Sequence, residues 1–210
     1  MANESKRPYR KRRRAEQEDR TRLRITQAAM DLHGTLGPAR TTIGRIAAAA
    51  GVQRATVYRH FPDSDALFAA CSAHWASLRP PPDPAGWAAI ADPDERLRHA
   101  LAELYAWFAW GEPMLVNVIR DAPLVPACAR AGVELQRHFE ALHEALMKGR
   151  RTRGRARARQ SAALAHALAF PTWQSLVREN RLEQAEAIDL MAALITEAAK
   201  PARPSTRPAP

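Results

Sequence analysis

The chain has 210 residues, 46% of them hydrophobic, which suits one domain of ordinary size or a small domain joined to a larger one. Its formal net charge of +10 favours a polyanionic partner, such as nucleic acid or an anionic membrane surface. No apolar run approaches the ~20 residues that a bilayer crossing needs, and the basic start leads into polar sequence, so we expect a cytoplasmic protein without a membrane partner.

Sequence patterns for metal, cofactor or catalytic chemistry do not occur. Cys71 and Cys128 lie in no metal-binding spacing and cannot build a disulfide framework. His138 and His143 are five residues apart, which does not align two imidazoles on one helical face. HExxH, GxSxG, GxxxxGK[ST] and GxGxxG patterns are absent. We therefore expect no metal, no cofactor and no enzymatic activity.

The first 17 residues form a basic arm with few apolar side chains, and we expect it to be disordered in the free protein. Its cationic residues are Lys6, Arg7, Arg10, Lys11, Arg12, Arg13 and Arg14. From Asp19 the pattern becomes helical, and it stops near Gly37-Pro38. The apolar residues of this helix recur on one face: Ile25, Ala29, Leu32 and Leu36.

A second helix follows directly. Thr41 or Thr42 can cap it by accepting an amide hydrogen, and Gly51 ends it. Its apolar face is Ile43, Ile46, Ala47 and Ala50. Ala47 is small where two helices would approach, and Gly51 permits the positive backbone angle of a tight turn. This arrangement predicts a helix-turn-helix unit.

The third helix spans about 54–61 and is too short to be stable alone. Val57 and Phe61 anchor it, so its other side faces outward. That outward side and its flanks are polar, basic and aromatic: Arg54, Ala55, Tyr58, Arg59 and His60. Such a surface is typical of a helix presented to a partner.

Pro62 ends the third helix, and Asp63 or Ser64 caps a fourth that reaches about Leu78. RPPPDPAG at 79–86 predicts an extended break, and Asp92-Pro93 begins another helix. We expect 111–126 to be shorter and broken by prolines, 148–159 to be a solvated charged link, and 201–210 to be disordered. Further helices are predicted at 131–148, at 157–178 with a kink at Pro171, and at 182–199.

The segment TTIGRIAAAAGVQRATVYRHFPDSDALFAAC resembles the DNA-binding segment of TetR-family transcriptional regulators. The family pattern runs Thr, apolar, Ile-Ala, Gly-Val, Thr, Tyr, His-Phe and Leu, and the match covers about 22–75. The resemblance implies an all-α fold with an N-terminal three-helix helix-turn-helix DNA-binding domain and a larger helical ligand-binding and dimerisation domain. The expected boundaries are 1–17 for the arm, 18–64 for the DNA-binding domain, 65–78 for a connecting helix, 79–200 for the larger domain and 201–210 for the tail.

The resemblance also implies roles for single residues. Arg54, Ala55 and Tyr58 would face base edges, since arginine can grip guanine and a methyl can contact thymine. The residues expected to hold or flank phosphates are Thr42, Thr56, Arg59 and His60. The basic arm could enter the minor groove or track the backbone, or it could serve only solubility. Gly44 and Ser64 depart from the family pattern, which carries a polar contact and a lysine there.

The larger domain would bind an unknown small-molecule effector. Aromatic residues at helical spacing are more often core than ligand site, but together they fit an apolar pocket. Our predicted lining is Trp107, Trp110, His138, Phe170 and Trp173. The family implies a homodimer formed through the last two helices and a repressor of a pseudo-palindromic operator. The alternatives are a sequence-independent polyanion or membrane-surface binder using the arm, and a thiol sensor through Cys71 or Cys128.

Overall fold

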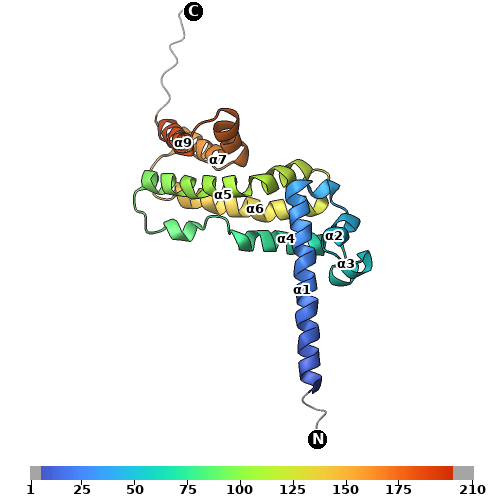
Figure 1. The fold of residues 1–210 in the computed structure, drawn as a ribbon. Coiled ribbons are helices and arrows are strands. Elements are labelled where there is room, and N and C mark those ends of the chain that lie inside the picture. The colour runs from blue at the N-terminus through green and yellow to red at the C-terminus, as the bar shows by residue number, and fades with distance from the viewer. Residues whose placement is uncertain (1–5, 201–210) are drawn as a thin grey trace, which may run out of the picture. The chain divides into compact units, whose positions relative to one another are not determined.

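The computed structural model describes residues 6–200, and within them it contains helices but no strand (Figure 1). The all-α prediction is therefore confirmed. Predictions made for residues 1–5 and 201–210 fall outside the described part of the chain. None of the described helices combines the length and the apolar content that a bilayer crossing requires. The elements in chain order are α1 (Lys6–Thr35), η1 (Pro38–Arg40), α2 (Ile43–Ala49), α3 (Arg54–His60), α4 (Ser64–Leu78), η2 (Pro84–Trp87), α5 (Pro93–Asp121), α6 (Pro126–Met147), α7 (Gly154–Ala167), α8 (Phe170–Trp173), the π-helical η3 (Gln174–Glu179) and α9 (Gln184–Ala198).

Residue contacts divide the chain into two compact units. Unit 1 comprises Met1–Pro80 and Gly111–Glu134, and unit 2 comprises Pro81–Trp110 and Leu135–Pro210. Helices α5 and α6 therefore contribute residues to both units. The sequence analysis expected one change of domain near residue 79, whereas the first compact unit also includes the end of α5 and the start of α6.

The core of unit 1 joins the second half of α1 to α2, α3 and α4. Its fully or nearly fully buried members include Ile25, Ala29, Ile46, Ala47, Val57, Phe61, Leu67 and Cys71. Burying one large apolar side chain contributes about 1.5–3 kcal/mol. Since α3 has only seven residues, this packing and not its own propensity holds it in place.

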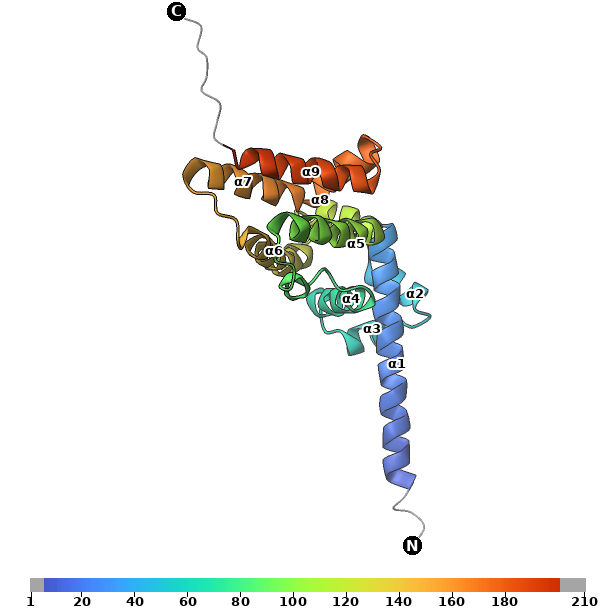
Figure 2. The ribbon, with the colours of Figure 1, turned by 90° about the vertical axis from the view of Figure 1, so that its left-hand side faces the viewer.

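The first half of α1 differs from the expected disordered arm, because the helix begins at Lys6 (Figures 1 and 2). All residues from Lys11 to Arg20 are exposed, so no apolar packing explains this order. Local terms do: Arg, Lys, Glu and Gln are good helix formers, and Arg12–Glu16 and Arg14–Glu18 form ion pairs one turn apart. Composition alone suggested disorder because it ignores this pairing.

Unit 1 also contains a hydrogen-bonded attachment of the end of α5. The buried Asp121 carboxylate accepts the Ala39 backbone N–H at 2.9 Å and the Arg120 Nε–H at 2.7 Å. Asn117 Nδ2 donates to the Gly34 carbonyl oxygen at 2.7 Å. The last turns of α5 are therefore tied to the segment that connects α1 to α2.

Helix α5 continues through Pro113 to Asp121, so the prediction of a broken segment over 111–126 was wrong for its first part. The buried face of α5 runs on both sides of the proline: Leu104, Tyr105 and Phe108 before it, and Leu115, Asn117 and Asp121 after it. An interior proline costs about 3 kcal/mol. Burial along the whole helix offsets that cost.

The region around Pro171 also differs from the expected single kinked helix. Helix α7 ends at Ala167, and α8 begins at Phe170 with Pro171 in its first turn. A proline fits the first turn because the missing N–H would have no intrahelical partner there. The chain then continues as η3, so the proline begins a new helical segment instead of bending an existing one.

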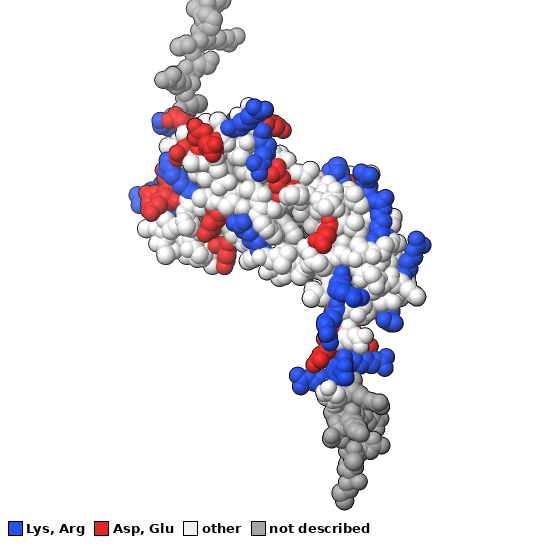
Figure 3. Space-filling view, viewed as in Figure 1, with Lys and Arg blue, Asp and Glu red and all other residues white. Residues whose placement is uncertain are grey.

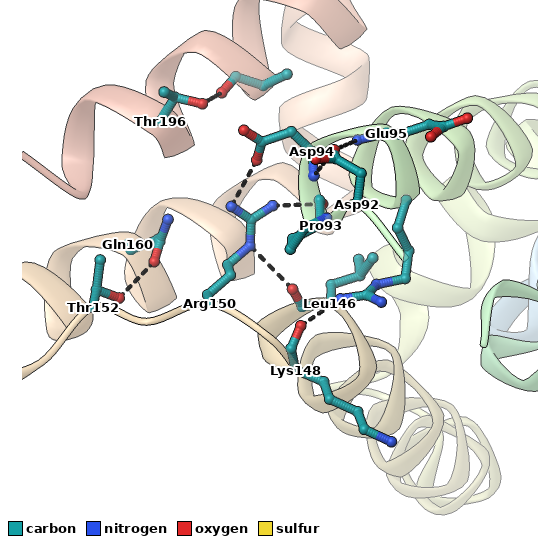
Figure 4. Close-up of polar contacts among 12 residues, drawn as sticks. Asp92, Pro93, Asp94, Glu95, Leu146, Lys148, Arg150, Thr152, Gln160 and Thr196 are labelled. Atoms are coloured by element: carbon teal, nitrogen blue, oxygen red, sulfur yellow. Dashed lines mark hydrogen bonds and ion pairs between the residues drawn. The ribbon is translucent and has the colours of Figure 1, made fainter. Parts of the chain in front are cut away.

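Arg150 lies at the centre of a polar cluster in unit 2 (Figure 4). Its Nη1 donates to Asp94 Oδ1 at 2.8 Å, its Nη2 to the Pro93 carbonyl oxygen at 2.9 Å and its Nε to the Leu146 carbonyl oxygen at 3.1 Å. Only 6% of the Arg150 side chain is exposed. This arginine ties the end of α6 to the start of α5. The prediction of a solvated link over 148–159 was therefore wrong for Arg150.

Candidate nucleic-acid interface

A capped helix and a glycine turn position the predicted reading helix. Thr42 precedes α2, and its Oγ1 accepts the Arg45 backbone N–H at 3.3 Å. Between α2 and α3, Gly51 has a φ of 62°, which only glycine adopts without strain. The Val52 N–H donates to the Ala47 carbonyl oxygen at 2.9 Å, which closes the turn.

Helix α3 buries one face and exposes the other. Val57 is fully buried and Phe61, directly after the helix, is 1% exposed. Tyr58 is 56% exposed although it is large and partly apolar. The predicted base-facing residues Arg54, Ala55 and Tyr58 are all exposed, as is Arg59, whereas Thr56 and His60 are half-buried.

Gly44 and Arg54 approach each other closely. A Cβ built on Gly44 would lie 2.6 Å from Arg54 Nη2 and 3.1 Å from Arg54 Cζ, so the guanidinium occupies the space that a side chain would take. Gly44 has no left-handed φ that would require glycine. The departure from the family pattern at Gly44 therefore has a steric consequence: the guanidinium of the first α3 residue rests against α2.

Arg22, which sequence reasoning did not select, lies against the end of α3. Its Nη1 donates to the His60 carbonyl oxygen at 2.7 Å, and its guanidinium lies 4.2 Å from the centroid of the Phe61 ring. Both contacts hold the last turn of α3 against α1. No sequence pattern marks Arg22, because its partners are 38 and 39 residues away.

His60 is held within this basic surrounding. Burial lowers the pKa of His60, and the nearby charges of Arg59 and Arg22 lower it further. Its Nε2 is buried and has no hydrogen-bond partner among the described residues.

The basic arm lies along the exposed first half of α1. Lys11, Arg12, Arg13 and Arg14 are exposed, whereas the side chains of Arg7 and Arg10 fall outside the described part. Figure 3 shows Lys and Arg side chains gathered on this described stretch, with acidic side chains among them. The arm residues thus lie on a helix and not on the disordered arm that the sequence suggested.

Ser64 is the first residue of α4, and the cap is Asp63. The Asp63 carboxylate accepts the Ala66 backbone N–H at 2.7 Å. Of the two cap candidates, the structure therefore selects Asp63. Ser64 is exposed, and no lysine stands at the position where the family pattern carries one.

Three of the five predicted effector-site residues meet in unit 2, around Phe108. Ring centroids lie 5.3 Å apart for Phe108–Phe170, 5.5 Å for Phe170–Trp173 and 5.8 Å for Trp107–Phe108. Trp173 is fully buried, and its Nε1 has no hydrogen-bond partner among the described residues. Phe108 is the central member that the predicted lining lacked.

The two remaining predicted lining residues are half-buried. His138 Nε2 donates to the Pro82 carbonyl oxygen at 2.9 Å, and its ring meets the edge of Phe139, which stacks on Phe108. Trp110 lies two residues after Phe108 on α5. His138 therefore reaches the aromatic cluster only through Phe139.

The two thiols are buried and protonated. Burial raises the pKa of Cys71 to about 12 and that of Cys128 to about 11, and the Asp121 carboxylate adds to the rise at Cys128. A sensing thiol reacts as the thiolate and therefore needs a lowered pKa. These environments argue against the thiol-sensor alternative.

Comparison with known proteins identifies the family of the reading segment. Residues 25–71 match the sequence model of the family described as bacterial regulatory proteins, tetR family. The comparison with curated proteins gave no match. The family match covers the last third of α1, all of α2 and α3, and the first half of α4.

Solved structures of similar fold cover nearly the whole chain. A TetR-like transcriptional regulator from Rhodococcus sp. RHA1 is 21% identical, with 84% of this chain and 94% of that chain covered and a TM-score of 0.59. NalD of Pseudomonas aeruginosa, the secondary repressor of the MexAB-OprM multidrug efflux pump, is 20% identical over 87% and 96%, with a TM-score of 0.58. FadR of Thermus thermophilus, a TetR-family repressor solved with lauroyl-CoA, is 25% identical over 90% and 100%, with a TM-score of 0.52. Residues 25–71 are therefore a DNA-binding segment of the TetR-family type, and nearly the whole chain is similar in fold to TetR-family transcriptional regulators.

Proposed function

We propose that this regulator is a ligand-responsive repressor that binds a pseudo-palindromic operator as a homodimer. The observation that carries the proposal is the exposed face of α3, where Arg54, Ala55, Tyr58 and Arg59 surround the buried anchor Val57. An exposed tyrosine beside two exposed arginines on a rigidly anchored helix is suited to a DNA groove.

The residues of this surface divide into two roles. Arg54, Ala55 and Tyr58 face base edges, where a guanidinium grips guanine and the Ala55 methyl contacts thymine. Thr42, Thr56, Arg59 and His60 hold or flank phosphates. The arm residues Lys11 to Arg14, together with Arg7 and Arg10, add contacts along the backbone that do not depend on base sequence.

The effector site is proposed at the aromatic cluster of unit 2. Trp107, Phe170 and Trp173 pack around Phe108 in the apolar interior, and the buried Trp173 Nε1 is a donor without a partner among the described residues, which an effector that opens this cluster would satisfy. The similar FadR was solved with lauroyl-CoA, and NalD represses a drug efflux pump, which supports an organic small molecule as effector.

The homodimer is proposed to form through the last helices, α7 and α9. Helix α9 exposes Leu190 and Leu194, which are 47% and 42% exposed, beside its buried residues. Helix α7 exposes Ala158, Ala162 and Ala165, whose small side chains permit close helix contact. Together the two helices offer an apolar surface to a second copy.

Effector binding would act by biasing the distance between the two reading helices of the dimer. Half-sites on one face of DNA repeat about every 34–36 Å, one helical turn. A dimer whose reading helices no longer match that spacing loses affinity. Release of the operator then ends repression.

Selection of bound duplexes from random DNA, repeated at two salt concentrations, tests the proposal. A palindromic consensus with half-sites about one turn apart is expected at both salt concentrations. The Tyr58→Ala variant should lose preference at particular base pairs while keeping most of its salt dependence. Enrichment without any consensus would contradict the proposal and would favour the sequence-independent polyanion or membrane-surface binder.

A further inference from the structure

A cleft of about 300 Å³ lies between α1 and the end of α3. Figures 1 and 2 show these two helices next to each other in unit 1. The cleft residues are Arg14, Gln17, Glu18 and Thr21 from α1, and Arg59 and His60 from α3. Sequence reasoning did not bring these two groups together, because about 40 positions separate them.

The cleft contains more positive than negative charge. Arg14 Nε pairs with Glu18 Oε1 at 3.2 Å, and both side chains are more than half exposed. Arg59 forms no ion pair with any described residue, and His60 Nε2 has no hydrogen-bond partner. Thr21 donates its hydroxyl to the Gln17 carbonyl oxygen at 2.9 Å and is already satisfied. Arg59 is therefore the unpaired cation of the cleft, and Arg14 is a cation held by a carboxylate.

The first half of α1 has no apolar packing, since residues Lys11 to Arg20 are all exposed. Helix-forming residues and the ion pairs Arg12–Glu16 and Arg14–Glu18 hold it as a helix. Four consecutive cations, Lys11 to Arg14, lie directly before the cleft. A polyanion lying along this stretch would neutralise the cations and stabilise the helix at the same time.

We propose that the cleft holds a phosphodiester group of the operator backbone, gripped by Arg14 from α1 and by Arg59 from α3, and that Glu18 competes with this phosphate for Arg14. The inference rests on the proposed function, because the strand that flanks the groove read by α3 passes the end of that helix. The α1 extension and the reading helix then act as two sides of one clamp on the DNA backbone. Glu18 lowers affinity because its carboxylate occupies the Arg14 guanidinium.

The chain offers a matched control. Arg12 and Glu16 form the same i,i+4 pair on the same helix, at 3.0 Å, two residues before Arg14 and Glu18. Neither Arg12 nor Glu16 lines the cleft. Any effect of net charge alone must therefore appear equally in both pairs.

The experiment measures operator affinity against salt for the full-length wild type and the four variants Arg14→Ala, Glu18→Gln, Arg12→Ala and Glu16→Gln. Arg14→Ala is expected to weaken binding about fivefold or more and to reduce the slope of log affinity against log salt by about 0.9. Glu18→Gln is expected to strengthen binding about threefold, and this gain should vanish in the Arg14→Ala background. Arg12→Ala also removes an arm cation and should weaken binding, but by less than Arg14→Ala does, because Arg12 does not line the cleft. Glu16→Gln should change affinity by less than half as much as Glu18→Gln.

Two results would overturn the inference. One is equal behaviour of the two pairs, since net charge would then explain everything. The other is a gain from Glu18→Gln that persists without Arg14.

Failure of the proposed function looks different: Tyr58→Ala would leave base preference unchanged. If Tyr58→Ala relaxes base preference while Arg14 and Glu18 behave like their controls, only the clamp is wrong. A last measurement titrates the protein–operator complex with inorganic phosphate at constant ionic strength. If low millimolar phosphate displaces the operator, and the Arg14 and Glu18 variants behave like the Arg12 and Glu16 variants, the cleft is a site for a free anion instead.

Discussion

At the residue scale, Gly44 controls where the guanidinium of Arg54 lies. In a helix, glycine costs about 1 kcal/mol relative to alanine, and Gly44 has no positive φ that would explain it. The close approach of Arg54 explains it instead. A glycine that lowers helix stability and makes room for a side chain proposed to read DNA is expected where function opposes stability.

Gly44→Ala is therefore expected to have opposite effects on folding and on DNA binding. The methyl group would raise the helix propensity of α2 by about 1 kcal/mol, and it would displace the Arg54 guanidinium. We expect operator binding to weaken by about 1–3 kcal/mol, with relaxed preference at the base pair that Arg54 reads. Urea unfolding and selection of bound sequences measure the two effects.

Gly132→Ala is the matched control, because a Cβ there meets no atom within 4 Å. It should raise stability and leave base preference unchanged. In the Arg54→Ala background, Gly44→Ala should have no further effect on DNA binding. Base preferences identical to those of the wild type would show that position 44 does not place Arg54.

A second residue-scale prediction concerns His33, which is buried in unit 1 and lies 5.3 Å from the Phe68 ring. Burial lowers the pKa of His33 from 6.5 to about 4, although the Asp121 carboxylate opposes the shift. Between these values the unfolded chain binds a proton that the folded chain does not. The contribution of His33 to the free energy of unfolding is therefore fully present above about pH 6.5. It falls by about 3 kcal/mol as the pH drops to about 4.

His33→Gln should flatten this dependence. The difference in the free energy of unfolding between pH 7.5 and pH 4.5 is expected to be about 2–3 kcal/mol smaller in His33→Gln than in the wild type. His99→Gln is the surface control, since half of the His99 side chain is exposed. If both variants keep the wild-type pH dependence, carboxylates and not His33 cause the acid sensitivity.

At the element scale, the helices α2, α3 and α4 were predictable because their ends carry local signals. Thr42 and Asp63 cap α2 and α4, and Gly51 makes the turn between α2 and α3. The site residues predicted on α3 also share one surface. A short helix that buries one face leaves only the opposite face free. Short-range chemistry therefore determined both the elements and the predicted contacts.

Other elements depended on terms that local signals do not carry. The start of α1 depends on ion pairs between exposed side chains, and the length of α5 depends on burial on both sides of Pro113. The α1–α3 cleft and the Arg22 contacts join positions far apart in sequence. The helix propensities of single residues contain neither kind of information. For this reason the sequence analysis predicted a disordered arm and a broken segment over 111–126, and the structure differs from both predictions.

The passage of α5 through Pro113 leads to an element-scale prediction. Pro113 is exposed, so its replacement removes no buried contact, and alanine would restore a backbone donor within the helix. Pro113→Ala is expected to stabilise the protein by as much as about 3 kcal/mol, measured by urea or thermal unfolding. Pro126→Ala is the control, because Pro126 is also exposed but is the first residue of α6, where no donor is needed. A loss of stability in Pro113→Ala would mean that the proline ring makes the helix geometry possible.

At the scale of the whole molecule, the predictable part ends where the family pattern ends. The family match covers residues 25–71, while the second unit is similar to solved structures only in fold. Its aromatic cluster was partly predictable, because aromatic residues at helical spacing share faces. The effector itself is not, since its identity depends on how those faces meet and not on any local motif.

The proposed dimer gives a whole-molecule prediction with two readouts. Leu190→Arg combined with Leu194→Arg would place charges in the apolar surface of α9, and burying an unpaired charge costs far more than the contact can return. We expect a folded monomer by sedimentation, because both leucines are about half exposed and belong to no core. Its affinity for the full palindrome should fall about 10²-fold or more, whereas its affinity for a single half-site should change little, since only the gain from simultaneous binding is lost.

Leu124→Arg is the control for the dimer variant. Leu124 is 73% exposed, more than either α9 leucine, but it lies in unit 1 between α5 and α6. If exposure of apolar surface alone caused association, Leu124→Arg would change the mass as much as the α9 variant does. A wild-type mass for Leu124→Arg beside a monomeric α9 variant would assign the dimer contact to α9. A dimeric α9 variant that still binds the palindrome with full affinity would place that contact on another surface, and the last helices would then serve only to pack unit 2.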